Sequence, residues 1–148
     1  MTLELLLRYL HFLSILAIAG TLTAEAIMVK EKMNRKMIGT VARIDLLYGI
    51  AAITLLAAGL TLWLAGIGKP AAWYSRNWIF HLKLTLFVLI GLLSIYPTVF
   101  FLKKSKGDPN EEVPVPAIIR YSIYTELLLL AIIPMLAGLM ARGIGLPG

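Results

Sequence analysis

The sequence predicts an all-α integral membrane protein whose four transmembrane helices form an up-down-up-down bundle. Composition supports this fold class, because 59 % of the 148 residues are hydrophobic and only 15 % are charged, whereas soluble domains carry about 25 % charged residues. The apolar residues also gather in four stretches that are long enough to cross a bilayer. A helix needs about 20 residues to span the hydrocarbon, since it rises ~1.5 Å per residue. The expected environment of most of the chain is therefore a lipid bilayer.

The four predicted spans make up a single domain, 1–148. They cover approximately residues 3–29, 44–67, 78–102 and 117–140. Lipid offers no hydrogen-bond partners to the backbone, so each span has to be a helix that satisfies its own peptide groups. The connections between spans are short, and short connections make consecutive helices antiparallel. The first connection is expected to be a polar loop over residues 30–40.

Basic residues are distributed unequally between the two ends of this bundle. Nine belong to the first and third connections and their flanks: Lys30, Lys32, Arg35, Lys36, Arg43, Lys103, Lys104, Lys106 and Arg120. Four belong to the other end: Arg8, Lys69, Arg76 and Arg142. The positive-inside rule places the richer end in the cytoplasm, with both termini and the loop that holds Trp73 and Tyr74 outside. A net charge of +6 that lies in such loops argues against nucleic-acid binding.

The chain contains two histidines, His11 and His81, and both lie inside predicted spans. Their helices run in the same direction, so the two imidazoles have a similar depth in the membrane. In an up-down bundle these two helices are also diagonal to each other. Two imidazoles that face each other across a bundle core can bind one haem iron. We therefore expect haem b, with His11 and His81 as axial ligands. The alternative is that each histidine only forms hydrogen bonds near the interface.

Cations near the same end are candidates for binding the haem propionates. They are Arg8, Lys69, Arg76 and Arg142. Lys83 is a further cation within the third span, two residues from His81. Two residues correspond to about 200° around a helix, so the two side chains cannot both face the bundle centre. Either Lys83 extends to the outer interface, or it is the inward group, pairing with a propionate or carrying protons, and His81 is peripheral.

A second polar cluster is expected in the cytoplasmic half of the bundle. Its members are Glu25, Arg43, Asp45, Arg120 and Glu126, with Tyr48, Tyr121 and Tyr124 around them. Acids and bases at one depth in a membrane are expected to pair, because an isolated charge there is costly. One interpretation is an ion-pair clasp that joins three helices. The other is a functional site: a proton path, or an inner site for a quinone or a cation.

Four segments of the chain resemble a family of uncharacterised four-helix bacterial membrane proteins. They are RYLHF at Arg8–Phe12, RIDLLYG at Arg43–Gly49, FHLKLTLF at Phe80–Phe87 and MARG at Met140–Gly143. This resemblance covers nearly the whole chain and implies a multi-pass protein of the bacterial inner (cytoplasmic) membrane. In that membrane the distribution of basic residues predicts that both termini are in the periplasm. The resemblance implies no activity.

A more distant similarity is to HemJ, a membrane protoporphyrinogen oxidase that binds haem b. HemJ also has a histidine in its first helix and an H-x-K pattern in its third. The similarity implies that His11 is a haem ligand and that His81 and Lys83 correspond to the H-x-K element. After its first histidine HemJ has a Tyr-Leu-Pro-Arg stretch that ends in a further histidine, whereas this chain reads AGTLTAEAIMVK.

Three functional hypotheses follow from the sequence. The first is a haem b protein that transfers single electrons between an outer donor and the membrane quinone pool, since two axial imidazoles favour electron transfer over oxygen activation. The second is a HemJ-like porphyrinogen oxidase that uses the same site. The third is a cofactor-free transporter or assembly subunit that uses the inner polar cluster. A homo-oligomer is compatible with each. The absence of cysteine excludes disulfides, thiolate metal sites and cysteine nucleophiles.

Overall fold

Four long helices dominate the computed structural model of the chain, which describes residues 2–66, 72, 75–142 and 145. They are α1 (Leu3–Met28), α2 (Arg35–Leu64), α4 (Trp78–Lys104) and α5 (Ala117–Ala141). Each of these four is long and apolar enough to cross a membrane. The all-α four-helix prediction is confirmed, and three of the predicted spans agree with the helices to within two residues at either end.

The second helix differs most from its prediction, because α2 begins at Arg35 instead of near residue 44. Asn34 caps it, and the Asn34 Oδ1 atom accepts a hydrogen bond of 2.7 Å from the Met37 backbone N–H. Ile38 and Val41 in its first turns are fully buried. Packing therefore stabilises a helical extension that is too polar to be recognised as a membrane span. At the other end, α2 finishes at Leu64, and position 67 lies outside the described residues.

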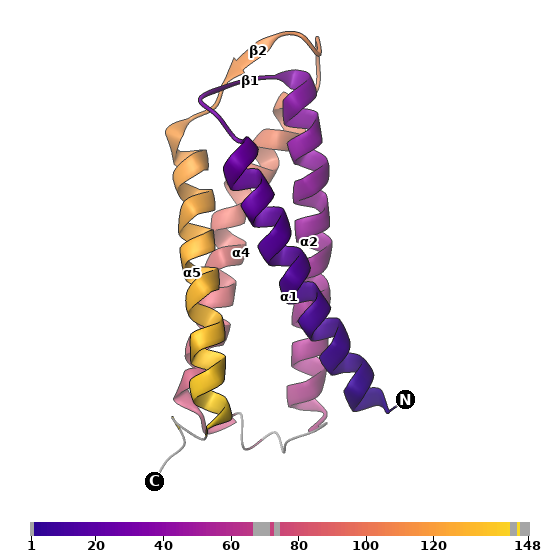
Figure 1. Cartoon of the computed structure of the whole chain (residues 1–148), viewed down its shortest axis with the longest axis vertical. Coiled ribbons are helices and arrows are strands. Elements are labelled where there is room, and N and C mark those ends of the chain that lie inside the picture. The colour runs from indigo at the N-terminus through magenta and orange to yellow at the C-terminus, as the bar shows by residue number, and fades with distance from the viewer. Residues whose placement is uncertain (1, 67–71, 73–74, 143–144, 146–148) are drawn as a thin grey trace.

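A two-stranded antiparallel sheet, which the all-α prediction does not contain, joins the first and third connections. Strand β1 (Lys32–Asn34) pairs with β2 (Glu112–Pro114), with Met33 opposite Val113. Both of these side chains point inward and are buried on a core that includes Phe101. The sheet covers one end of the bundle, called here the hairpin end (Figure 1). The opposite end, where α1 begins and α5 finishes, is called the termini end.

The helices form a ring in the order α1, α2, α4, α5. The most extensive contacts are between α1 and α2 and between α4 and α5, with smaller contacts between α2 and α4 and between α1 and α5. Helices α1 and α4 are consequently diagonal, as the short connections predict. Toward the termini end α1 leans away from α5, and the two helices separate (Figure 1).

Arg35 holds the hairpin end together, and Gly107 gives it room. The Arg35 guanidinium donates to the Lys104 carbonyl oxygen at 2.8 Å and pairs with Glu111 at 2.9 Å. Gly107 has a φ of +124°, and a Cβ atom on it would lie 2.9 Å from the Arg35 Nε atom. The position therefore requires glycine both for its backbone conformation and for the space that the guanidinium occupies.

We predict that Gly107→Ala lowers the free energy of unfolding by about 1–3 kcal/mol, the usual cost of a strained backbone position. Unfolding in mixed detergent micelles would measure this difference. Gly20→Ala is the matched control, because a Cβ atom there meets nothing within 4 Å and alanine is the better helix former. Equal stabilities of the two variants would contradict the prediction.

Candidate functional site

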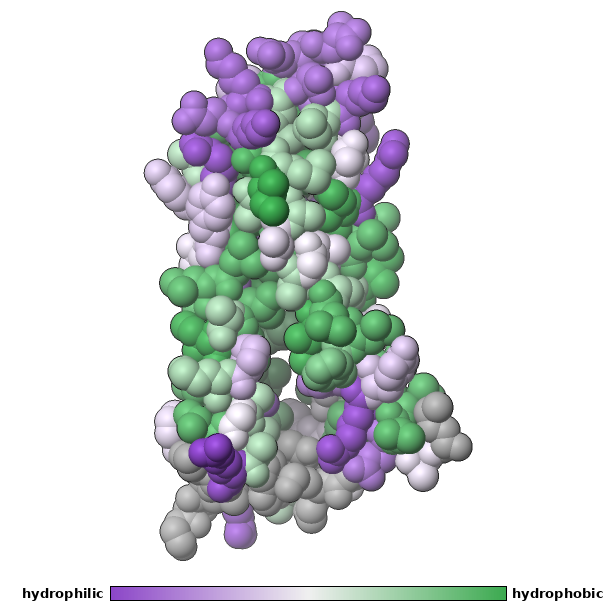
Figure 2. Space-filling view, viewed as in Figure 1, coloured by the Kyte–Doolittle hydropathy of each residue, from purple (hydrophilic) through white to green (hydrophobic). Residues whose placement is uncertain are grey.

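A cavity of about 650 Å³ lies between the four helices in the half of the bundle toward the termini end. Helices α1, α2, α4 and α5 all contribute to its walls. Every described residue that lines it is apolar except His11 and Lys83. Figure 2 shows an apolar middle band, hydrophilic side chains at the hairpin end, and a hollow in the lower half between the α1 and α5 sides. The cavity is thus open sideways to the region that lipid would fill.

His11 is half-buried on the wall of this cavity, beside Gly59 of α2. A Cβ atom on Gly59 would lie 3.7 Å from both the Cε1 and the Nδ1 atoms of the His11 ring. The Nδ1 atom is buried and has no hydrogen-bond partner among the described residues. A buried nitrogen without a partner is unusual, because it loses its hydration without replacement. The Leu55 backbone approaches the His11 ring, and the Nδ1 atom can bind a ligand when the ring carries its proton on the other nitrogen.

Lys83 lines the cavity with His11, whereas His81 does not. The His81 Nε2 atom lies 2.8 Å from the Ser75 carbonyl oxygen, and its exposed ring stacks edge-on to Phe80 with centroids 5.5 Å apart. The two residues are about 200° apart around α4, so one faces inward and the other outward. The structure therefore has the arrangement with Lys83 inward and His81 peripheral. The expectation that His81 and His11 face each other is not met.

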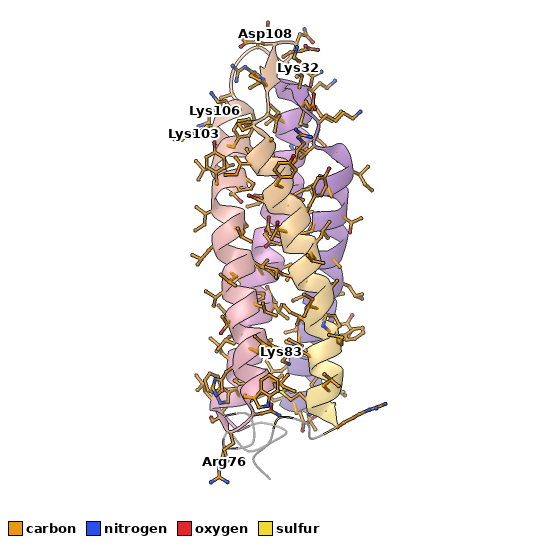
Figure 3. All side chains as sticks on the ribbon, turned by 90° about the vertical axis from the view of Figure 1, so that its left-hand side faces the viewer. Lys32, Arg76, Lys83, Lys103, Lys106 and Asp108 are labelled. Carbon is orange, nitrogen blue, oxygen red and sulfur yellow. The ribbon has the colours of Figure 1, made fainter. Side chains whose placement is uncertain are left out.

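The outer arginines also lie apart from the cavity. Arg8 pairs with Glu4 one turn away, at 3.0 Å on the exposed side of α1. Arg76 is exposed and points away from the bundle (Figure 3). Neither contributes to the cavity walls. Lys83 is therefore the cation that the described walls offer to an anionic group of a ligand. Lys69, Trp73 and Tyr74 lie outside the described residues.

A second site lies on the hairpin side of the cavity, where Glu25, Asp45 and Glu126 are buried to 1 %, 5 % and 1 % exposure. The Tyr48 hydroxyl donates to the Glu126 Oε1 atom at 3.1 Å, and the Thr98 hydroxyl donates to the Asp45 Oδ2 atom at 2.5 Å. We call these five residues the carboxyl cluster. An apolar layer separates it from the cavity. That layer is formed by Ile18, Leu22, Ala51, Leu55 and Ile90.

The arginines expected in this cluster are not in it. Arg43 is exposed, and Arg120 pairs instead with Glu31 at 3.8 Å. Arg43 and Asp45 are two residues apart on one helix, so their side chains point in nearly opposite directions. The predicted ion-pair clasp is therefore not formed, although its three acids do come together. Tyr121 and Tyr124 are also exposed, which leaves Tyr48 as the one of the three tyrosines that reaches the acids.

Gly59 provides the space beside His11, and the spacing of small residues along α2 is the sequence signal for such space. One residue that shapes these sites was missed by sequence reasoning. Thr98 supplies a hydrogen bond to Asp45 from α4. A threonine in a transmembrane helix usually bonds to its own backbone, so its position in the sequence gave no signal for this contact.

Comparison with known proteins gives one match. The chain matches the family described as predicted membrane protein (DUF2214) over residues 3–145. No curated protein matches, and no solved structure does. The four apolar helices agree with this description. The chain belongs to the DUF2214 family of predicted membrane proteins.

Proposed function

We propose that the cavity binds haem b through His11 and that the protein transfers electrons in the membrane. The observation that carries this proposal is the buried Nδ1 atom of His11, which has no partner among the described residues and borders an otherwise apolar cavity. Imidazole nitrogen is the commonest protein ligand of haem iron. In a bundle, such ligands come from side chains that face the space between helices.

The residues that line the cavity fit haem in size and in chemistry. A cavity of about 650 Å³ falls in the range of about 300–1,000 Å³ typical of small-molecule sites. Phe12, Phe80 and Phe87 line it, and aromatic walls suit a flat macrocycle. Lys83 offers a positive charge to a propionate, which would otherwise be buried without a partner. When bound, haem would supply a one-electron iron couple.

The chain's own residues favour electron transfer over bond-making chemistry. His11 would hold the cofactor, Lys83 would orient it, and the apolar walls would exclude water. Among the described lining residues only His11 and Lys83 carry ionisable groups, so few groups are present for acid–base catalysis. The sideways opening between α1 and α5 gives access to a lipid-soluble redox partner such as a quinone.

The proposed orientation places the cavity in the outer half of a bacterial inner membrane, with both termini in the periplasm. The hairpin end carries the larger group of basic residues, including Lys32, Lys103 and Lys106 (Figure 3). Positive charge is enriched on the cytoplasmic side of membrane proteins. The electron donor would then reach the protein from the periplasmic side.

A porphyrinogen oxidase similar to HemJ is the second candidate. Lys83 of the H-x-K element and His11 line the same cavity. These are two of the positions that the resemblance to HemJ singles out, and this supports the second candidate. Complementation of a bacterial strain that lacks this oxidation step distinguishes the two functions. An electron carrier does not rescue growth, whereas an oxidase does.

The absorption spectrum of the purified protein tests haem binding. We expect a Soret band in protein that is purified from cells supplied with haem, and a shift of that band on reduction. A folded preparation without a Soret band, before and after the addition of haem, would overturn the proposal. It would favour a cofactor-free transporter or assembly subunit.

A further inference from the structure

The carboxyl cluster brings three acids together within the apolar bundle, and none of the described residues supplies a cation to it. Glu25 comes from α1, Asp45 from α2 and Glu126 from α5, and all three are at least nine-tenths buried. The neighbouring arginines do not compensate them, because Arg43 is exposed and Arg120 pairs with Glu31. Three carboxylates buried in this way would repel one another and would lose their hydration, which makes the fully ionised state very costly.

The hydrogen bonds of the cluster leave one acceptor without a donor. Thr98 donates to Asp45, and Tyr48 donates to Glu126. The Glu25 Oε2 atom is completely buried and receives no hydrogen bond from the described residues. Its side chain lies within hydrogen-bonding reach of the Asp45 carboxyl group. Ionised carboxylates only accept hydrogen bonds, so these two groups can bond only if one of them holds a proton.

None of the four helices supplies a compensating cation from the residues that the structure describes. The polar side chains that face the cluster are Glu25 on α1, Asp45 and Tyr48 on α2, Ser94 and Thr98 on α4, and Glu126 on α5. None is a base. The described His, Asp and Glu residues also form no group of three that could hold a metal ion. The ligand that matches the vacant acceptor is therefore a proton.

We propose that Glu25 and Asp45 form a proton-binding site in the hairpin half of the membrane domain. Glu25 holds the proton and donates it in a hydrogen bond to the Asp45 carboxylate, which Thr98 stabilises with a second hydrogen bond. The site exchanges protons slowly, because apolar cores cover it on both sides. This inference does not depend on haem binding.

Infrared spectroscopy of the full chain in lipid tests the proposal. At neutral pH the wild type should show the C=O stretching band of protonated carboxyl groups, and Glu25→Gln should remove the part of that band that Glu25 contributes. Glutamine keeps an N–H donor for Asp45, so we expect this variant to fold. Glu112→Gln is the matched control, since Glu112 is exposed on β2 and its replacement should leave the band unchanged.

Two further measurements keep the test decisive. Carbon-13 labelling of the glutamate carboxyl groups should shift the band in the wild type, which assigns it to glutamate even if Glu25→Gln fails to fold. Glu126→Gln should retain the band. A wild type without the band would overturn the proposal. So would a band whose intensity is unchanged in Glu25→Gln, a band that is lost completely in Glu126→Gln, or a band that does not respond to the label.

Discussion

Replacing His11 by alanine is expected to abolish the Soret band of the purified protein, whereas replacing His81 is expected to leave it intact. His11 lines the cavity and offers a free Nδ1 atom. The His81 ring lies outside the cavity, close to the Ser75 carbonyl oxygen. Loss of the only imidazole in the described walls removes the iron ligand, and no second histidine can replace it from there.

Absorption spectra of His11→Ala and His81→Ala, prepared in parallel with haem supplied, would measure this difference. The two variants are matched controls for each other, because each removes one imidazole from the same half of the bundle. Circular dichroism would confirm that both remain helical. A band that disappears in His81→Ala but persists in His11→Ala would contradict the assignment of the ligand.

Replacing Lys83 by methionine is expected to weaken haem binding about 10–100-fold. A hydrogen bond to a charged group contributes about 1.5–3 kcal/mol, and each 1.4 kcal/mol corresponds to a factor of ten in affinity. Methionine keeps the length and the apolar stem of lysine but removes the ammonium group that would pair with a propionate. Lys83→Arg keeps the charge and should retain most of the affinity.

Haem titration of the haem-free protein, followed at the Soret band, would give the dissociation constants. Lys103→Met is the matched control, because Lys103 is exposed at the hairpin end (Figure 3) and should bind haem as the wild type does. An unchanged dissociation constant in Lys83→Met would show that Lys83 does not pair with the ligand. A band with altered position in Lys83→Met would instead indicate that Lys83 contacts the iron.

The four helices could be predicted because lipid offers no hydrogen-bond partners to the backbone. A stretch of about 20 apolar residues therefore has to form a helix, in which all backbone hydrogen bonds are internal. The diagonal relation of α1 and α4 followed from short connections alone. The depths of His11, Lys83 and the three acids followed as well, because position along a helix is a simple count of residues.

Tertiary structure decided which way each helix faces. His81 and Lys83 have nearly the same depth, yet only packing determines that Lys83 faces the cavity. Arg43 and Asp45 also have nearly the same depth, but Arg43 is exposed and Asp45 is buried. The acids therefore form a cluster without the arginines of the expected ion-pair clasp. The β1–β2 pairing likewise depends on contacts between residues about 80 positions apart. The sequence alone determined the depth of each side chain in the membrane. Rotation of the helices about their axes, which is set by the mutual packing of all four, determined which side chains meet.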